Sequence, residues 1–169
     1  MNMTYKEILP GIRLRVIETS RFETNALSVQ FLSGADEKCA SNMTLVPRVL
    51  RRGSLKHPDM EALAAALDEM YGAHIEPISR KYGDIMTSGF ICDFVDADGK
   101  MLSPLCALLG EIMFKTKKED GAFVSEYVAG ERSNLIDEIK SEINNKLSYA
   151  HRRATEKMFS GSAYAVSEL

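Results

Sequence analysis

The first part of the chain alternates apolar and polar residues with a period of two, which is typical of half-buried β-strands. Ile12, Leu14 and Val16 form one apolar row. Residues 26–32 repeat the pattern. We therefore predict two adjacent antiparallel strands, joined by a turn at residues 20–23.

Apolar positions with the helical repeat come next and predict two helices. Ser41 or Asn42 can cap the first helix, which ends at residues 53–54. The second opens at residues 58–59 and ends at residues 71–72, because proline is favoured in a first helical turn and glycine after the last. Each helix should bury one face against a sheet.

The rest of the chain predicts two more strands and further helices. Residues 74–79 and 85–95 have strand character and flank a turn at residues 82–84. Residues 105–114 are expected to form an apolar helix. Residues 124–159 are expected to form a long helical stretch, either continuous or divided by a break. This stretch should bury an apolar stripe, namely Val128, Leu135, Ile139, Ile143, Leu147 and Ala150.

The order of these elements indicates the fold class. Strands, helices, strands and helices follow one another, which favours an α+β fold of two layers over a doubly wound parallel sheet. We expect a largely antiparallel sheet of at least four strands, with the helices packed on one face. A length of 169 residues fits one domain, residues 1–169.

Composition excludes several classes of protein. A net charge of −3 and a pI near 5.7 argue against a nucleic-acid surface. No apolar run reaches the roughly 18 residues needed to cross a membrane, and no secretory signal is indicated, so the cytoplasm is the expected location. The three cysteines, Cys39, Cys92 and Cys106, fit neither a disulfide framework nor a thiolate zinc site, and we expect reduced, buried thiols.

Candidate chemistry is sparse. Two histidines can hold one metal ion from a helix only if they lie one turn apart, and His57, His74 and His151 are too widely separated for that. Each is interpreted as a loop or surface imidazole. Serine-nucleophile and glycine-rich phosphate motifs are missing from the sequence.

An acidic row on the long helical stretch is the one arrangement that resembles a site. Glu131, Glu138 and Glu142 share a helix face by their spacing. They could bind a cation. The alternative, favoured on residues alone, is a solvated face with ion pairs worth about 0.2–0.5 kcal/mol each. The basic neighbours on the same stretch are Arg132, Lys140 and Lys146.

Four ordered motifs resemble the insulinase/pitrilysin peptidases, family M16, and most of all a bacterial cytoplasmic branch that is paired with an active homologue. The motifs are TSRFETN at residues 19–25, LRRGS at 50–54, LDEMYGA at 67–73 and ERSNLIDEI at 131–139. The resemblance implies the LuxS/mitochondrial-processing-peptidase-like metallohydrolase fold. It also implies that the chain is the N-terminal part of an M16-like domain, with the rest of the subunit missing.

The resemblance also implies a lost zinc site. Active members carry an inverted motif, H-x-x-E-H, and a distal glutamate as third ligand. The two histidines of that motif correspond to Thr44 and Arg48 in this chain, and its catalytic glutamate corresponds to Pro47. The third ligand corresponds to Glu138, and a supporting acidic residue to Glu131. One remaining carboxylate ligand cannot hold a catalytic zinc ion, so no cofactor is expected.

The substitutions suggest what replaces the metal. Arg48 places a permanent cation where zinc sits in active members, and its natural partner is Glu138, as a guanidinium–carboxylate pair. Pro47 removes a backbone donor together with the carboxylate that activates water.

The function implied by the resemblance is a catalytically inactive subunit. It would pair with an active M16 homologue, or with itself, to bind and enclose unfolded peptides. An edge strand near the N-terminus could take part by pairing with an extended peptide. Two alternatives stay open: a zinc enzyme with Glu131, Glu138 and a distant histidine such as His151 as ligands, and a scaffold or interaction domain acting in the modification of another protein.

Overall fold

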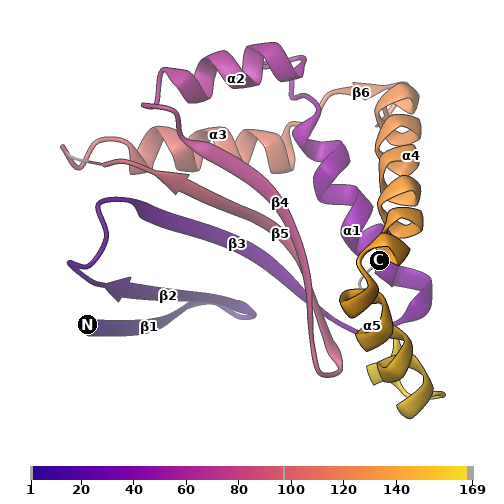
Figure 1. Cartoon of the computed structure of the whole chain (residues 1–169). Helices are drawn as coiled ribbons and strands as arrows, with labels where there is room; N and C mark the ends of the chain where they lie inside the picture. The colour runs from indigo at the N-terminus through magenta and orange to yellow at the C-terminus, as the bar shows by residue number, and fades with distance from the viewer. Residues whose placement is uncertain (1, 97, 167–169) are drawn as a thin grey trace.

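The computed structural model describes residues 2–96 and 98–166 and contains three small antiparallel sheets and five α-helices within them (Figure 1). The strands are β1 (Asn2–Leu9), β2 (Ile12–Glu18), β3 (Asn25–Gly34), β4 (His74–Tyr82), β5 (Ile85–Phe94), β6 (Lys118–Glu119) and β7 (Ala122–Phe123). The helices are α1 (Glu37–Arg51), α2 (Met60–Asp68), α3 (Leu102–Phe114), α4 (Ser125–Ser141) and α5 (Lys146–Met158). Two short 3-10 helices are η1 (Glu142–Asn144) and η2 (Ala163–Ala165).

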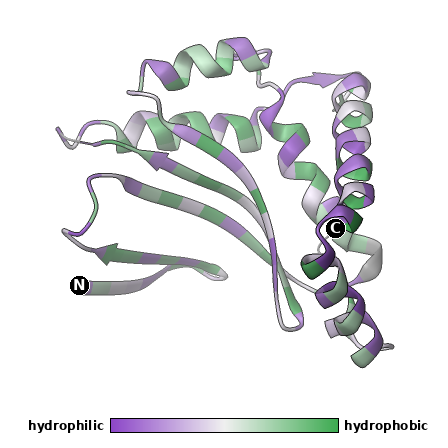
Figure 2. Cartoon of the chain, in the orientation of Figure 1, coloured by the Kyte–Doolittle hydropathy of each residue, from purple (hydrophilic) through white to green (hydrophobic). Residues whose placement is uncertain are grey.

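The central sheet has the order β3-β5-β4, with antiparallel pairs throughout. Its core side is covered by α1, α2 and α3, and Figure 2 shows that α3 is mostly apolar (green). The core contains Leu63 from α2, Phe90 and Cys92 from β5, and Leu105 and Ile112 from α3. The predicted α+β fold class is therefore confirmed.

Strand pairing differs from the prediction at the N-terminus. The strand at residues 12–17 does not pair with the strand at residues 26–32: β2 pairs with β1, and β3 pairs with β5 over its whole length. Gly11, at φ +82°, allows a tight turn between β1 and β2, so β2 already has a local partner. The expected strands are thus divided between a three-stranded sheet and a separate hairpin.

Helix boundaries agree with the sequence at α2 and differ at α1. Asp59 caps α2, and its carboxylate accepts a hydrogen bond from the Ala62 N–H at 2.8 Å. Helix α1 begins at Glu37, ahead of the predicted cap at Ser41 or Asn42. The Asp36 carbonyl accepts hydrogen bonds from the Cys39 and Ala40 N–H groups in its first turn. No helix among the described residues is long and apolar enough to cross a membrane.

The long helical stretch is interrupted, as predicted, but most of its apolar stripe is not buried. Leu135 is buried, whereas Ile143 is 58% exposed and Leu147 is 83% exposed. Helix α4 packs beside α1, and α5 continues past the N-terminal end of α1 (Figure 1). The second half of the stripe therefore has no neighbouring element to cover it within the described residues.

The three cysteines are free, and only one of them is buried. Burial raises the pKa of Cys92 to about 12, with a smaller contribution from the neighbouring Asp93 charge. Cys39 and Cys106 are exposed, so the expectation of buried thiols is wrong for these two. Both lie on helices, Cys39 on α1 and Cys106 on α3.

Candidate functional site

A cleft of about 790 Å³ lies between α1, α4 and β4. Its walls are mostly charged. The end of α1 and the residue that follows it supply three arginines, α4 supplies acidic residues and β4 supplies one more. The charged lining residues include Arg48, Arg51, Arg52, Glu76, Glu131 and Glu138. The structure thus brings together Arg48, Glu131 and Glu138, three of the residues selected from the sequence.

Arg48 and Glu138 form a bidentate pair across the cleft. The two guanidinium nitrogens of Arg48 donate to the two carboxylate oxygens of Glu138 at 2.7 and 2.8 Å. This hydrogen bonding lowers the pKa of Glu138 below its usual value and raises that of Arg48. The pairing expected from the sequence is confirmed. The assignment of position 48 to a former zinc ligand stays a prediction.

A double-mutant cycle measures this pair. We expect Arg48→Met and Glu138→Gln to show a coupling free energy of about 0.5–1 kcal/mol in urea unfolding, because Glu138 is half exposed and solvent screens the pair. The Glu138 pKa is depressed in the folded state, so the coupling should be present at neutral pH and lost as pH falls through that depressed pKa. Additive effects of the two substitutions at pH 7 would contradict this.

Glu131 and Arg52 make a looser contact in the same cleft. The guanidinium of Arg52 lies 3.4 Å from the Glu131 carboxylate and 5.6 Å from the centre of the Tyr127 ring. The Nε atom of Arg52 is buried and has no hydrogen-bond partner among the described residues. Arg52 therefore retains one unsatisfied donor.

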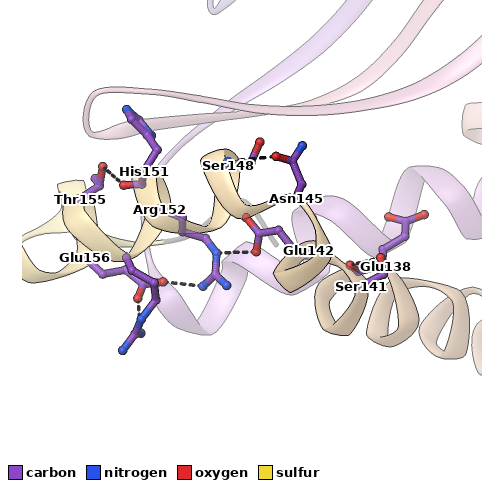
Figure 3. Close-up of polar contacts among 10 residues, drawn as sticks. Glu138, Ser141, Glu142, Asn145, Ser148, His151, Arg152, Thr155 and Glu156 are labelled. Atoms are coloured by element: carbon purple, nitrogen blue, oxygen red, sulfur yellow. Dashed lines mark hydrogen bonds and ion pairs between the residues drawn. The ribbon is translucent and has the colours of Figure 1, made fainter.

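The acidic row of α4 is neutralised by other elements rather than by its basic neighbours. Glu138 pairs with Arg48 of α1 and Glu131 with Arg52, the residue after α1. Glu142, at the start of η1, accepts from Arg152 of α5 at 2.6 Å (Figure 3). In the described part of the chain, no ion pair joins this row to Arg132, Lys140 or Lys146, the partners considered from the sequence. Tertiary packing, and not helix spacing, sets these pairs.

Thr44 and Pro47 lie one helical turn or less from Arg48 on α1, on its buried side. The Thr44 hydroxyl contacts the Ser79 hydroxyl of β4 at 3.1 Å. Pro47 has no N–H, so the Met43 carbonyl one turn earlier lacks its helical donor. The hydroxyl of Ser88 on β5 donates to that carbonyl instead. These two contacts, at Thr44 and at the Met43 carbonyl, attach α1 to the sheet.

The residues present do not fit a zinc ion. Glu131 and Glu138 are engaged by arginines, and Arg48 brings a positive charge to the place where a cation would bind. No three His, Cys, Asp or Glu side chains among the described residues form a group that could hold a metal. His151 lines a different cavity, of about 870 Å³. Figure 3 shows it at the opposite end of the polar row from Glu138.

A second polar cluster, around Glu111, was not predicted from the sequence. The buried Glu111 carboxylate accepts hydrogen bonds from the Ser54 hydroxyl and from the Lys56 N–H at 3.0 Å, and it lies 3.2 Å from Nδ1 of His57. The cluster joins α3 to the loop that follows α1. One signal in the sequence could have indicated this cluster, namely a single acidic residue inside an apolar helix. A buried charge requires hydrogen-bonding partners, so such a residue predicts a polar cluster around it.

Comparison with known proteins confirms the resemblance to the M16 peptidases, here to members named as inactive. No protein-family model matches the chain. It is 27% identical over 161 residues to a Bacillus subtilis (strain 168) protein named "Probable inactive metalloprotease YmfF". The alignment covers 92% of this chain and 38% of that protein.

Two solved structures share the fold. A conserved protein from Enterococcus faecalis V583 superposes with a TM-score of 0.84 at 24% identity, covering 97% of this chain and 40% of that one. A peptidase M16 inactive domain from Pseudomonas fluorescens has a TM-score of 0.68 at 14% identity, covering 99% and 38%. The chain thus spans about two fifths of the length of each of these relatives.

Proposed function

We propose that this protein is a non-catalytic, peptidase-like subunit that binds peptides together with an active homologue. The bidentate pair of Arg48 and Glu138 carries the proposal. Zinc hydrolysis requires about three protein ligands and one open coordination position. In the proposed arrangement the Arg48 guanidinium stands in place of the metal, so the cleft would bind or position a chain without a zinc-activated water.

The similarity to a relative named as inactive supports the same conclusion. A cleft of about 790 Å³ is large enough for several side chains of an extended peptide. Its walls carry both signs of charge, which suits the polar backbone and mixed side chains of an unfolded substrate. In the proposed complex, the homologue supplies zinc and this subunit supplies part of the chamber wall, in the cytoplasm.

Co-expression tests this function. The chain is produced with an M16 homologue from the same genome that has an intact H-x-x-E-H motif. We expect a stable complex and chelator-sensitive hydrolysis of unfolded casein, and we expect hydrolysis to stop when the partner's motif glutamate is replaced by glutamine. The isolated chain, purified without added metal, should contain no stoichiometric zinc by elemental analysis. Chelator-sensitive hydrolysis by the isolated chain would overturn the proposal.

The two alternatives differ in support. A zinc enzyme using Glu131, Glu138 and His151 has no support, since His151 lines a separate cavity. A scaffold domain acting in the modification of another protein would be favoured over a peptidase subunit by a pull-down that returns a stable, non-peptidase partner.

A further inference from the structure

Residues 146–166, which comprise α5 and η2, form an arm that is separate from the core. Neither of these two elements has a buried residue. The hydrophobic core takes its side chains from the central sheet and from helices α1 to α3, and it includes no residue of the arm. Within the described residues, apolar packing against the core therefore does not fix the position of the arm, and polar contacts must do so.

The arm begins at a break in the helical stretch. Helix α4 ends at Ser141, the 3-10 turn η1 follows, and Asn145 leaves the helical region with φ −91° and ψ 85°. The Asn145 side chain accepts a hydrogen bond from the Ser148 N–H at 3.2 Å and so caps α5. A short 3-10 segment inside a helical stretch often marks a hinge. Residues 142–145 are therefore the hinge of the arm.

One polar contact of the arm lies at the hinge itself. Arg152 of α5 donates to Glu142 of η1 at 2.6 Å and to Glu156, one turn further along α5, at 2.6 Å (Figure 3). These pairs restrain the start of α5 but do not reach the central sheet. At the other end of the arm, the ring centroids of Phe159 and Tyr164 lie 4.4 Å apart, which attaches η2 to the end of α5. A group that holds η2 therefore also holds α5.

One side chain of the central sheet holds the far end of the arm. Lys81 of β4 donates from Nζ to the Tyr164 carbonyl at 2.5 Å and to the Val166 carbonyl at 2.6 Å. The same ammonium group lies 5.0 Å from the centre of the Tyr164 ring, within the range of a cation–π contact. In the described part of the chain, both hydrogen bonds that join the arm to the central sheet come from Lys81. Hydrogen bonds from a charged donor are stronger than neutral ones, so this one residue can set the position of η2.

The middle of the arm is separated from the sheet by a cavity. Helix α5 lies beside the tip of the hairpin formed by β4 and β5 (Figure 1). A cavity of about 870 Å³ lies between them and is lined by Lys81 and Gly83 of the hairpin and by His151 and Thr155 of α5. The contact made by Lys81 is therefore a bridge at one point and not part of a packed interface.

We infer that Lys81 is a latch for a mobile arm: releasing it detaches residues 146–166 from the sheet while the core stays folded. The hinge, the single point of attachment and the lack of buried side chains in the arm carry the inference. Local opening of this kind is expected where few apolar contacts hold a segment. Strand β4 also supplies Glu76 and Pro77 to the charged cleft, so a displacement of β4 at the cleft would be transmitted to the arm. The latch itself is independent of what the cleft binds.

Double electron–electron resonance measures the position of the arm. One spin label is attached to the exposed native Cys106 of α3 and one to Lys157→Cys on α5, in a chain with Cys39→Ser, and the buried Cys92 stays unlabelled. With Lys81 present, we expect one narrow distribution of distances between the labels. With Lys81→Met, we expect this narrow peak to be lost, because the arm no longer has a fixed angle.

Arg80→Met is the matched control for this measurement. Arg80 is the neighbouring cation on β4, it is exposed, and successive side chains of a strand point to opposite faces. The substitution removes the same charge from the same strand but leaves the latch in place, so the narrow peak should remain. A narrow peak in Lys81→Met, or its loss in both variants, would overturn the inference.

Amide hydrogen exchange of the unlabelled chain shows whether the core stays folded. In Lys81→Met, we expect residues 159–166 to exchange at least about tenfold faster, the factor expected from the loss of a hydrogen bond to a charged group, while β5 and α3 exchange as in the wild-type chain. Tyr164→Ala is a second variant, since it removes the ring that contacts both Lys81 and Phe159, and it should give the same localised acceleration. Unchanged exchange in the arm, or equal acceleration in the arm and the core, would contradict the latch.

Discussion

Replacing Glu111 with alanine is expected to lower the free energy of unfolding by about 3 kcal/mol, since the Ser54 hydroxyl and the Lys56 N–H would lose their buried acceptor and a cavity would form. For a chain of this size, that corresponds to a fall of about 6–12 °C in Tm. Urea unfolding at pH 7 and thermal unfolding measure the change. Glu69→Ala, at an exposed glutamate at the end of α2, is the control and should have an effect within about 0.5 kcal/mol.

The same carboxylate gives this stability a pH dependence. Burial alone would raise the pKa of Glu111, but the hydrogen bonds from Ser54, Lys56 and His57 outweigh it and lower the pKa. A depressed folded pKa contributes stability above the unfolded value, about 4.3, and that contribution is lost as pH falls through the folded value. Glu111→Gln should therefore flatten the acid side of the stability profile. An unchanged profile would show that the carboxylate is not ionised in the cluster.

Thr44→His together with Arg48→His is expected to create a zinc site. The two positions are one turn apart on α1, and Arg48 already faces Glu138, so the double variant would offer two imidazoles and one carboxylate. With free zinc at about a hundred times Kd, bound metal should raise the free energy of unfolding by about 2.7 kcal/mol. Thermal unfolding with and without zinc measures this. Hydrolysis is not expected, because the double variant has no glutamate at position 47, between its two histidines.

Two controls define the ligands of that designed site. Arg48→His alone provides too few ligands, and the double variant with Glu138→Gln removes the carboxylate, so neither should show zinc-dependent stabilisation of comparable size. If the double variant folds but gains no stability from zinc, the assignment of Thr44 and Arg48 to the former motif is wrong. The wild-type chain, measured in parallel, gives the baseline for adventitious zinc.

Local signals in the sequence predicted the elements better than their partners. The pair β4 and β5 was predictable because the turn at residues 82–84 lies between two apolar runs, and α2 was predictable because Asp59 is a strong cap. The partner of β2 was not, since periodicity identifies a strand without identifying its neighbour. The prediction that the apolar stripe on α4 and α5 would be buried was wrong for the same reason. Amphipathic spacing does not say whether another element is there to cover the apolar face.

At the candidate site, too, some contacts could be predicted from the sequence and others could not. The pairing of Arg48 with Glu138 could be predicted because the motifs of a known family fixed which helices face each other, and opposite charges then define the contact. The contacts of Arg52 with Glu131 and of Arg51 with Glu76 were not predicted, because one turn of helix can direct neighbouring arginines to different elements. The Glu111 cluster was missed since its partners lie more than 50 positions away in the chain.

The hydroxyl of Ser88 donates to the Met43 carbonyl, which Pro47 leaves without a helical donor, so a residue with an N–H at position 47 would disturb this contact. A glutamate in place of Pro47 would restore an amide hydrogen that competes with Ser88 for the same oxygen. The strand side chain would then lose its acceptor in a buried position, at a cost of about 1–3 kcal/mol. A glutamate at position 47 would therefore be accommodated only with a compensating change on β5, so the identities of residues 47 and 88 are coupled through one carbonyl oxygen.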